Sequence, residues 1–134
     1  MMTVKMTLLK AANAAGTLSM LGEQILPGRI AKVIFDNRKE LKHQIEFLEN
    51  EERKLISEYG AKMNENGRFH VDGDKKKNEE FCNKMLELQQ MEVEIHPIIV
   101  SADQLLEHAS IKPKDIENIE FLFEVPEEKG DGEE

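Results

Sequence analysis

The sequence predicts an α+β protein in which a long antiparallel helical hairpin projects from a small three-strand sheet with short helices. Residues 29–58 contain no Pro or Gly and repeat apolar side chains every three or four positions, as a helix with one buried face does. Residues 3–8, 91–100 and 119–125 have the short alternating pattern of strands. A length of 134 residues fits one domain.

Composition places the chain among compact globular proteins. The hydrophobic share of 40% is too high for general disorder, and the charged share of 34% is too high for a membrane protein. No apolar run approaches the roughly 20 residues that span a bilayer. The first residues lack the features of a signal peptide, and the single cysteine, Cys82, excludes an internal disulfide. We therefore predict a cytoplasmic location.

Two elements precede the long helix. Residues 3–8 form the first strand, and an Ala-rich helix over 9–23 carries one apolar stripe that Gly16 and Gly22 weaken. The segment 26–28 breaks the pattern, with Pro27 either just before or inside the first turn of the long helix.

The long helix has an apolar seam that a small core cannot cover. At 1.5 Å per residue the helix is about 45 Å long, so its distal half needs a second helix from this chain or from a neighbour. Phe81, Met85 and Leu88 cover less than this length, which predicts a homo-oligomer. Asn37 is a polar residue within the seam that could set the register of such an oligomer. The seam comprises Ile30, Ile34, Leu41, Ile45, Leu48, Leu55 and Tyr59.

The hairpin returns through a polar connection. Gly60 ends the long helix, and residues 62–74 contain two Gly turn signals, with a small hairpin over 68–71 at the tip. Asp74 is a predicted N-cap for a second helix that runs through Gln90.

The last third of the chain returns to the sheet. After the strand at 91–100, Ser101 and Gln104 have the spacing of a capping box for a short helix to His108. Pro113 opens one more helical turn before the last strand at 119–125. We assign residues 1–125 to one domain. Residues 126–134 hold five acids and no large apolar side chain, so we predict a disordered tail.

Several short motifs occur in a recognisable order. They are the Ala-rich first helix, Leu26-Pro27-Gly28-Arg29, Glu58-Tyr59-Gly60, the Asn-Gly segment, Glu80-Phe81, Met91-Glu92-Val93-Glu94-Ile95, and Pro113 ahead of Glu120-Phe121-Leu122-Phe123-Glu124. This order resembles a family of small proteins of unknown function that tailed phages and prophages encode, mostly in Gram-positive hosts. The resemblance implies a phage origin and a product located in the host bacterial cytoplasm. It supplies no catalytic residues.

Motifs for catalysis or metal binding are lacking in the sequence. The four histidines have no ligand spacing, and neither a Cys-x-x-Cys pair nor a phosphate-binding loop occurs. Residues 72–74 fit a turn and a helix cap better than a calcium loop. Cys82 has no base near it in sequence, which favours core packing. We therefore predict that the protein is not an enzyme and needs no metal or cofactor.

The charge is unevenly distributed along the chain. Residues 1–42 carry seven basic and three acidic side chains, a balance of +4, whereas residues 43–134 carry eleven and twenty-four, a balance of −13. General nucleic-acid binding is disfavoured, since it needs a coherent basic face.

The start of the long helix is the predicted site for an anion, because free backbone amides and basic side chains coincide there. Phe35 adds a stacking surface. The alternative is that these are solvated charges, balanced by Asp36 and Glu40, and residues 75–77 allow the same two interpretations. The predicted ligand-binding residues are Gly28, Arg29, Lys32, Asn37 and Arg38.

These observations favour a non-enzymatic phage accessory protein that binds a host component. The partner would be a host defence protein that it inhibits, or a small anionic nucleotide signal that it sequesters. The alternative is a tail-assembly chaperone or a minor structural protein of the virion. An enzyme would need a site that the sequence does not display.

Overall fold

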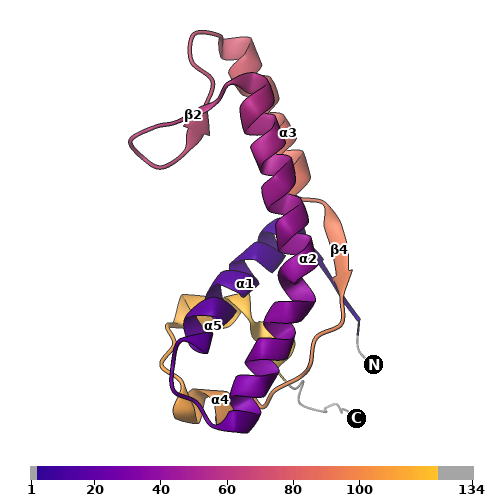
Figure 1. Ribbon diagram of the computed structural model, residues 1–134, viewed down its shortest axis with the longest axis vertical. Helices are drawn as coiled ribbons and strands as arrows, with labels where there is room; N and C mark the ends of the chain where they lie inside the picture. The colour runs from indigo at the N-terminus through magenta and orange to yellow at the C-terminus, as the bar shows by residue number, and fades with distance from the viewer. Residues whose placement is uncertain (1–2, 124–134) are drawn as a thin grey trace, which may run out of the picture.

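The computed structural model describes residues 3–123. It contains a body and a helical arm that extends from it (Figure 1). The elements in chain order are β1 (Val4–Thr7), α1 (Leu8–Gly22), α2 (Gly28–Tyr59), β2 (Lys62–Met63), β3 (Phe69–His70), α3 (Lys75–Gln89), β4 (Glu92–Ile95), α4 (Ala102–His108), α5 (Pro113–Asn118) and the 3-10 helix η1 (Glu120–Leu122). The mixed fold and the long helix are confirmed.

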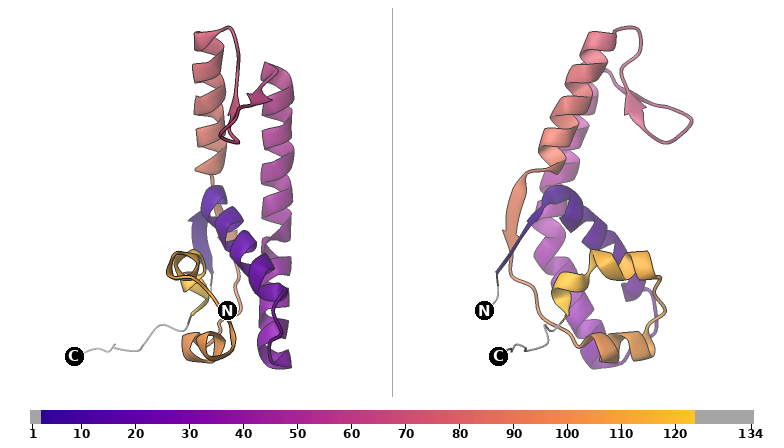
Figure 2. Two further views of the ribbon diagram at one scale, coloured as in Figure 1. Left: turned by 90° about the vertical axis from the view of Figure 1, so that its left-hand side faces the viewer. Right: turned by 180° about the vertical axis from the view of Figure 1, so that it is seen from behind.

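Helix α2 is the axis of the molecule. Its 32 residues correspond to about 48 Å. Helix α1 packs against its proximal half and α3 against its distal half, both on the same side (Figure 2). Leu8, Leu48 and Leu88 form a buried cluster where the two covering helices meet. The helix that covers the distal half of α2 therefore belongs to this chain. The seam does not need a second copy to cover it, so the reason given for a homo-oligomer is wrong.

The predicted three-strand sheet is wrong, because two separate two-strand sheets are present in the described residues. Strand β1 pairs antiparallel with β4, with Val4 opposite Ile95, and β2 pairs with β3 at the tip of the arm. The segment expected as the third strand forms η1, followed by an isolated bridge between Phe123 and Val100. Ile119 and Leu122 are both buried. A spacing of three residues between buried side chains matches the period of a 3-10 helix instead of the two-residue period of a strand.

Local capping signals explain where the helices begin and end. The side chains of Thr7, Asp74 and Ser101 accept hydrogen bonds from the backbone N–H of Lys10, Lys77 and Gln104. Gly60 ends α2 with a φ of 62°, a left-handed conformation that favours glycine. The predicted caps at Asp74 and Ser101 are confirmed, as is Pro113 at the first turn of α5. Residues 126–134, predicted as a disordered tail, lie outside the described residues.

The buried polar residue of α2 holds the segment that follows β4. Asn37 is 2% exposed. Its Nδ2 donates to the carbonyl oxygens of Val33 at 3.0 Å and Ile98 at 2.9 Å, and its Oδ1 accepts from the Ile98 N–H at 2.8 Å. Gln24 makes the same pair of bonds to the backbone of Ser110. These two side-chain amides satisfy backbone groups of Ile98 and Ser110, which lie outside both sheets.

Replacing Asn37 with Ala is expected to lower the free energy of unfolding by about 1–3 kcal/mol, because it leaves the N–H and C=O of Ile98 without partners. Urea denaturation followed by circular dichroism measures the change. Asn50→Ala is the control, since Asn50 is exposed on the same helix and should change stability by less than about 0.5 kcal/mol. Equal losses in the two variants would contradict the role of the buried amide.

Candidate functional site

The structure does not bring the five predicted anion-binding residues together. Gly28 and Arg29 are exposed at the first turn of α2, which has no side-chain cap. The ammonium of Lys32 lies 2.7 Å from a carboxylate oxygen of Asp36, so its charge is already balanced. Asn37 is buried with its amide fully bonded, which removes it from any ligand site. A polar residue occupies this position of the seam because its amide bonds to the backbone of Ile98, in the segment after β4.

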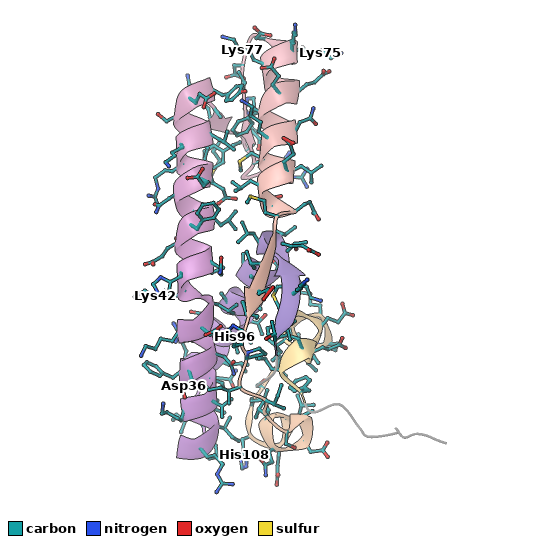
Figure 3. All side chains as sticks on the ribbon, turned by 90° about the vertical axis from the view of Figure 1, so that its right-hand side faces the viewer. Asp36, Lys42, Lys75, Lys77, His96 and His108 are labelled. Carbon is teal, nitrogen blue, oxygen red and sulfur yellow. The ribbon has the colours of Figure 1, made fainter. Side chains whose placement is uncertain are left out.

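The other basic segment lies far from this one. Lys75 and Lys77 stand at the tip of the arm, whereas Asp36 and Lys42 lie lower on α2 (Figure 3). The two segments therefore cannot act on one small ligand.

A groove runs between α1 and α2, and we call it the α1–α2 groove. Phe35 on its wall is 56% exposed, and the ammonium groups of Lys32 and Lys39 lie 5.8 Å and 6.0 Å from its ring centroid. Arg38 lies over Gly22, where a Cβ would come within 2.8 Å of its guanidinium. The groove is lined by Ala15, Ser19, Phe35, Arg38, Lys39, Lys42, Ile45, Glu46 and Glu49. Arg38, predicted as peripheral, thus belongs to a basic cluster with Lys39 and Lys42, about two and a half to three and a half turns beyond Arg29.

A second hollow, which we call the tip cleft, lies between the β2–β3 hairpin and α3. Leu86 is 55% exposed there, and Phe69 from the hairpin is 36% exposed. Cys82 is exposed, so its predicted core position is wrong. Phe81 faces α2, and a rotation of about 100° per residue turns Cys82 away from it. The cleft is lined by Glu52, Arg68, Phe69, Phe81, Cys82, Asn83, Met85, Leu86 and Gln89.

The walls of the tip cleft are held in place by contacts within the arm. The Tyr59 and Phe81 rings lie 5.8 Å apart, and the Lys84 ammonium lies 5.2 Å from the centroid of the Tyr59 ring. A hydrogen bond to the Tyr59 side chain raises the pKa of Lys84, and the charges of Tyr59 and Glu58 raise it further. These contacts join α3 to the end of α2 and fix the floor of the cleft.

The hairpin wall of the cleft is fastened separately. His70 Nε2 lies 2.6 Å from a carboxylate oxygen of Asp72, and the Val71 N–H donates to Asn78 Oδ1 at 2.8 Å. Asn64 Oδ1 accepts from the N–H groups of Asn66 and Arg68 and closes the turn. The hairpin is therefore tied to the first turns of α3.

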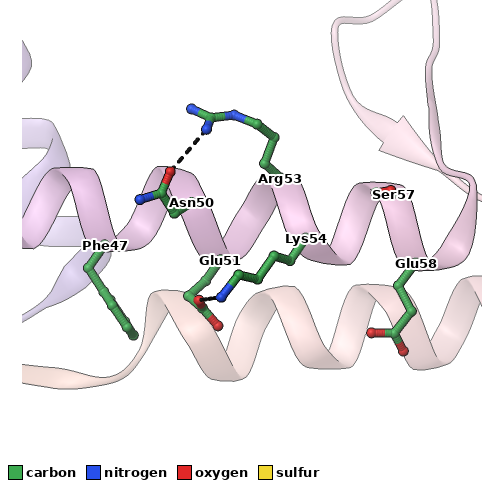
Figure 4. Close-up of a pocket in the computed structure, with 7 residues that line it drawn as sticks. All are labelled: Phe47, Asn50, Glu51, Arg53, Lys54, Ser57 and Glu58. Carbon is green, nitrogen blue, oxygen red and sulfur yellow. Dashed lines mark hydrogen bonds and ion pairs between the residues drawn. The ribbon is translucent and has the colours of Figure 1, made fainter.

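A third hollow, shallow and open, lies along α2 in the arm, and all of its lining side chains come from that helix. Four of them pair with one another, Arg53 with Asn50 at 2.9 Å and Lys54 with Glu51 at 2.8 Å (Figure 4). A face with its polar groups paired along one helix is typical of a solvated surface.

Over residues 3–123, no group of three or more His, Cys, Asp or Glu side chains is placed to hold a metal ion. Within the same range, no helix is both long and apolar enough to cross a membrane. No protein-family model, curated protein or solved structure matches the chain.

Sequence reasoning missed both hollows, although each has a signal in the sequence. Cys82, Leu86 and Gln89 recur at helical spacing on a face of α3 that is not the buried one. The α1–α2 groove also has a sequence signal, which is a second row of side chains at helical spacing on α2, beside the apolar seam. Such stripes are visible only when the face that the core uses is known.

We expect nucleotides to bind no tighter than about 1 mM, because Lys32 is paired and Asn37 is buried, which leaves Arg29 without a second fixed contact. Isothermal titration with a nucleoside triphosphate measures this affinity. Arg29→Glu is the matched variant, since the side chain is exposed and its loss should not affect folding.

Micromolar binding that disappears in Arg29→Glu would contradict this expectation. It would restore the start of α2 as the site of an anionic signal molecule.

Proposed function

We propose that this chain is a non-enzymatic phage accessory protein that acts in the host bacterial cytoplasm by binding a host protein through the tip cleft. The observation that carries the proposal is the cleft itself, in which Phe69 and Leu86 are exposed. It lies along the side of the arm, which extends beyond the body (Figure 1). These apolar side chains have no role in the buried core. Exposed apolar groups gathered in a hollow are typical of protein-binding surfaces.

The chemistry of the cleft favours a protein over a small ligand. Apolar atoms of Phe69, Met85 and Leu86 are surrounded by polar groups from Glu52, Arg68 and other residues. An apolar centre with a polar rim matches the usual composition of protein interfaces. The cleft is open on one side, so it would leave much of a small molecule in water.

The arm presents the cleft in a fixed geometry. The cluster of Leu8, Leu48 and Leu88 anchors the base of the arm, and the Tyr59–Phe81 contact anchors its end. A preformed surface loses little conformational entropy when it binds, which supports stoichiometric inhibition or sequestration.

The phage assignment rests on the resemblance of the short motifs described above. The proposal therefore has two parts, the origin of the protein and the surface that it uses, and the second can be tested alone.

Leu86→Lys is expected to abolish capture of the partner, because it places a charge in the apolar centre of the cleft. Tagged protein is expressed in a Gram-positive host, with and without phage infection, and co-purifying proteins are quantified by mass spectrometry. Leu106→Lys on α4 is the control, since it makes the same change at a leucine that is also exposed, at 41%. One host protein should be enriched with the wild type and the control, and reduced at least about tenfold with Leu86→Lys.

Enrichment that survives Leu86→Lys, or that both variants lose, would contradict the proposed surface. Selective capture of a phage tail protein, present only during infection, would replace host binding with the alternative role in virion assembly.

A further inference from the structure

The α1–α2 groove contains a second stripe on α2 that is separate from most of the buried seam. Phe35, Arg38, Lys42, Ile45 and Glu49 follow one another at steps of three and four residues. This spacing is that of a helix face that packs on another helix. All of these side chains are exposed except Ile45, which is half-buried, so the chain itself does not cover the stripe.

The charges on this stripe are ordered along the helix. Cations come first, and anions follow about two turns later. Lys39 precedes Glu46 by seven residues, and Lys42 precedes Glu49 by seven. The cationic members are Arg38, Lys39 and Lys42, and the anionic members are Glu46 and Glu49.

Most of these charged side chains form no ion pair within the described part of the chain. Arg38, Lys39, Lys42 and Glu49 form none there, and Glu46 meets only His43 at 3.9 Å. Lys42 and Glu46 are four residues apart on one helix and still form no ion pair. By contrast, Lys32 and Asp36 at the same spacing are 2.7 Å apart.

We propose that a second copy of this chain occupies the α1–α2 groove, with the two α2 helices antiparallel and a two-fold axis level with residues 43–44. This arrangement places Arg38 opposite Glu49 of the second copy, and the second copy's Glu46 lies two residues, about 3 Å along the helix, from the position opposite Lys39. Lys42 then lies beside its Ile45. Because the axis is two-fold, every contact is made twice, as in other self-complementary dimers. This dimer involves neither the tip cleft nor its proposed partner.

The order of charges selects this occupant over others. A parallel dimer would bring cations against cations and anions against anions, which is unfavourable. A uniformly acidic peptide would meet Lys39 and Lys42 favourably but would be repelled by Glu46 and Glu49. Only a helix whose charges run in the opposite order satisfies both ends, and an antiparallel copy of α2 is such a helix.

The neighbouring side chains permit a helix to approach. Ala15 and Ser19, four residues apart on α1, form the other wall of the groove and are small. Phe35 and Ile45 supply apolar contact on the α2 side. With two apolar residues per copy and several ion pairs, the dimer should be of micromolar strength and should weaken in salt.

A charge-swap experiment tests the dimer with the full-length chain. One variant carries Lys39→Glu and Lys42→Glu, so its stripe is entirely acidic apart from Arg38, and the other carries Glu46→Lys and Glu49→Lys, so its stripe is entirely basic. Sedimentation velocity at low salt should show the wild type as a dimer and each variant alone as a monomer. An equimolar mixture of the two variants should form a heterodimer, since opposite stripes then face each other.

A matched control separates the groove from overall charge. Lys75→Glu combined with Lys76→Glu changes the net charge by the same amount at the tip of the arm, and this variant should remain dimeric. Raising the salt from about 0.05 M to about 0.5 M should weaken the wild-type dimer at least about tenfold. Circular dichroism confirms that each variant keeps its helices.

Three outcomes would overturn the proposal. The wild type could be a monomer at high micromolar concentration in low salt, or both swapped variants could remain dimers alone. A mixture that stays monomeric would also refute it, even if each variant folds. A dimer insensitive to the swaps would place the interface on another face.

Discussion

One long helix has to bury an apolar stripe along its whole length, and the rest of the chain is arranged to achieve this. Helix α1 covers the proximal half of α2, and α3 covers the distal half. One leucine from each of the three helices is buried where α1 and α3 meet on α2, namely Leu8, Leu48 and Leu88. The body exists because the chain on either side of α2 and α3 folds back over the proximal half. The arm exists because the distal half receives only α3 and a hairpin.

Because α1 and α3 each cover part of one face of α2, other faces of these helices remain exposed. On α2 the open face is the wall of the α1–α2 groove, and on α3 it is the wall of the tip cleft. The two hollows share no lining residue, although Glu49 in one and Glu52 in the other are only one turn apart on α2. In an antiparallel dimer the two arms would point in opposite directions, and each would carry one tip cleft.

Much of the fold was predictable because its signals are local. The spacing of Ile30, Ile34 and Leu41 predicts α2, and the caps at Asp74 and Ser101 mark the starts of two later helices. The covering of the distal half follows from the predicted hairpin. The covering of the proximal half by α1 was not predictable, because apolar periodicity shows that a face is buried without showing which helix buries it.

The errors share a physical cause, which is that short segments take their structure from tertiary contacts. The apolar residues around Ile119 and Leu122 are compatible with a strand or with a 3-10 turn. Only the burial of these two side chains, three residues apart, distinguishes the two. Asn37 has the same appearance in sequence whether it binds a ligand, sets a register or bonds to the backbone of Ile98. Cys82 beside Phe81 is assigned correctly only when the direction of α2 from α3 is known.

The pairing of Val4 with Ile95 joins two parts of the chain that are far apart in sequence. These residues are 91 positions apart, so closing the β1–β4 sheet directly from the unfolded chain would lose much conformational entropy. The arm closes over a much shorter loop, from the end of α2 to the start of α3. Since β4 follows α3 closely, a formed arm returns β4 to the middle of α2, beside the start of α1. On this argument we expect the arm to form before the body and destabilisation of the arm to slow assembly of the body.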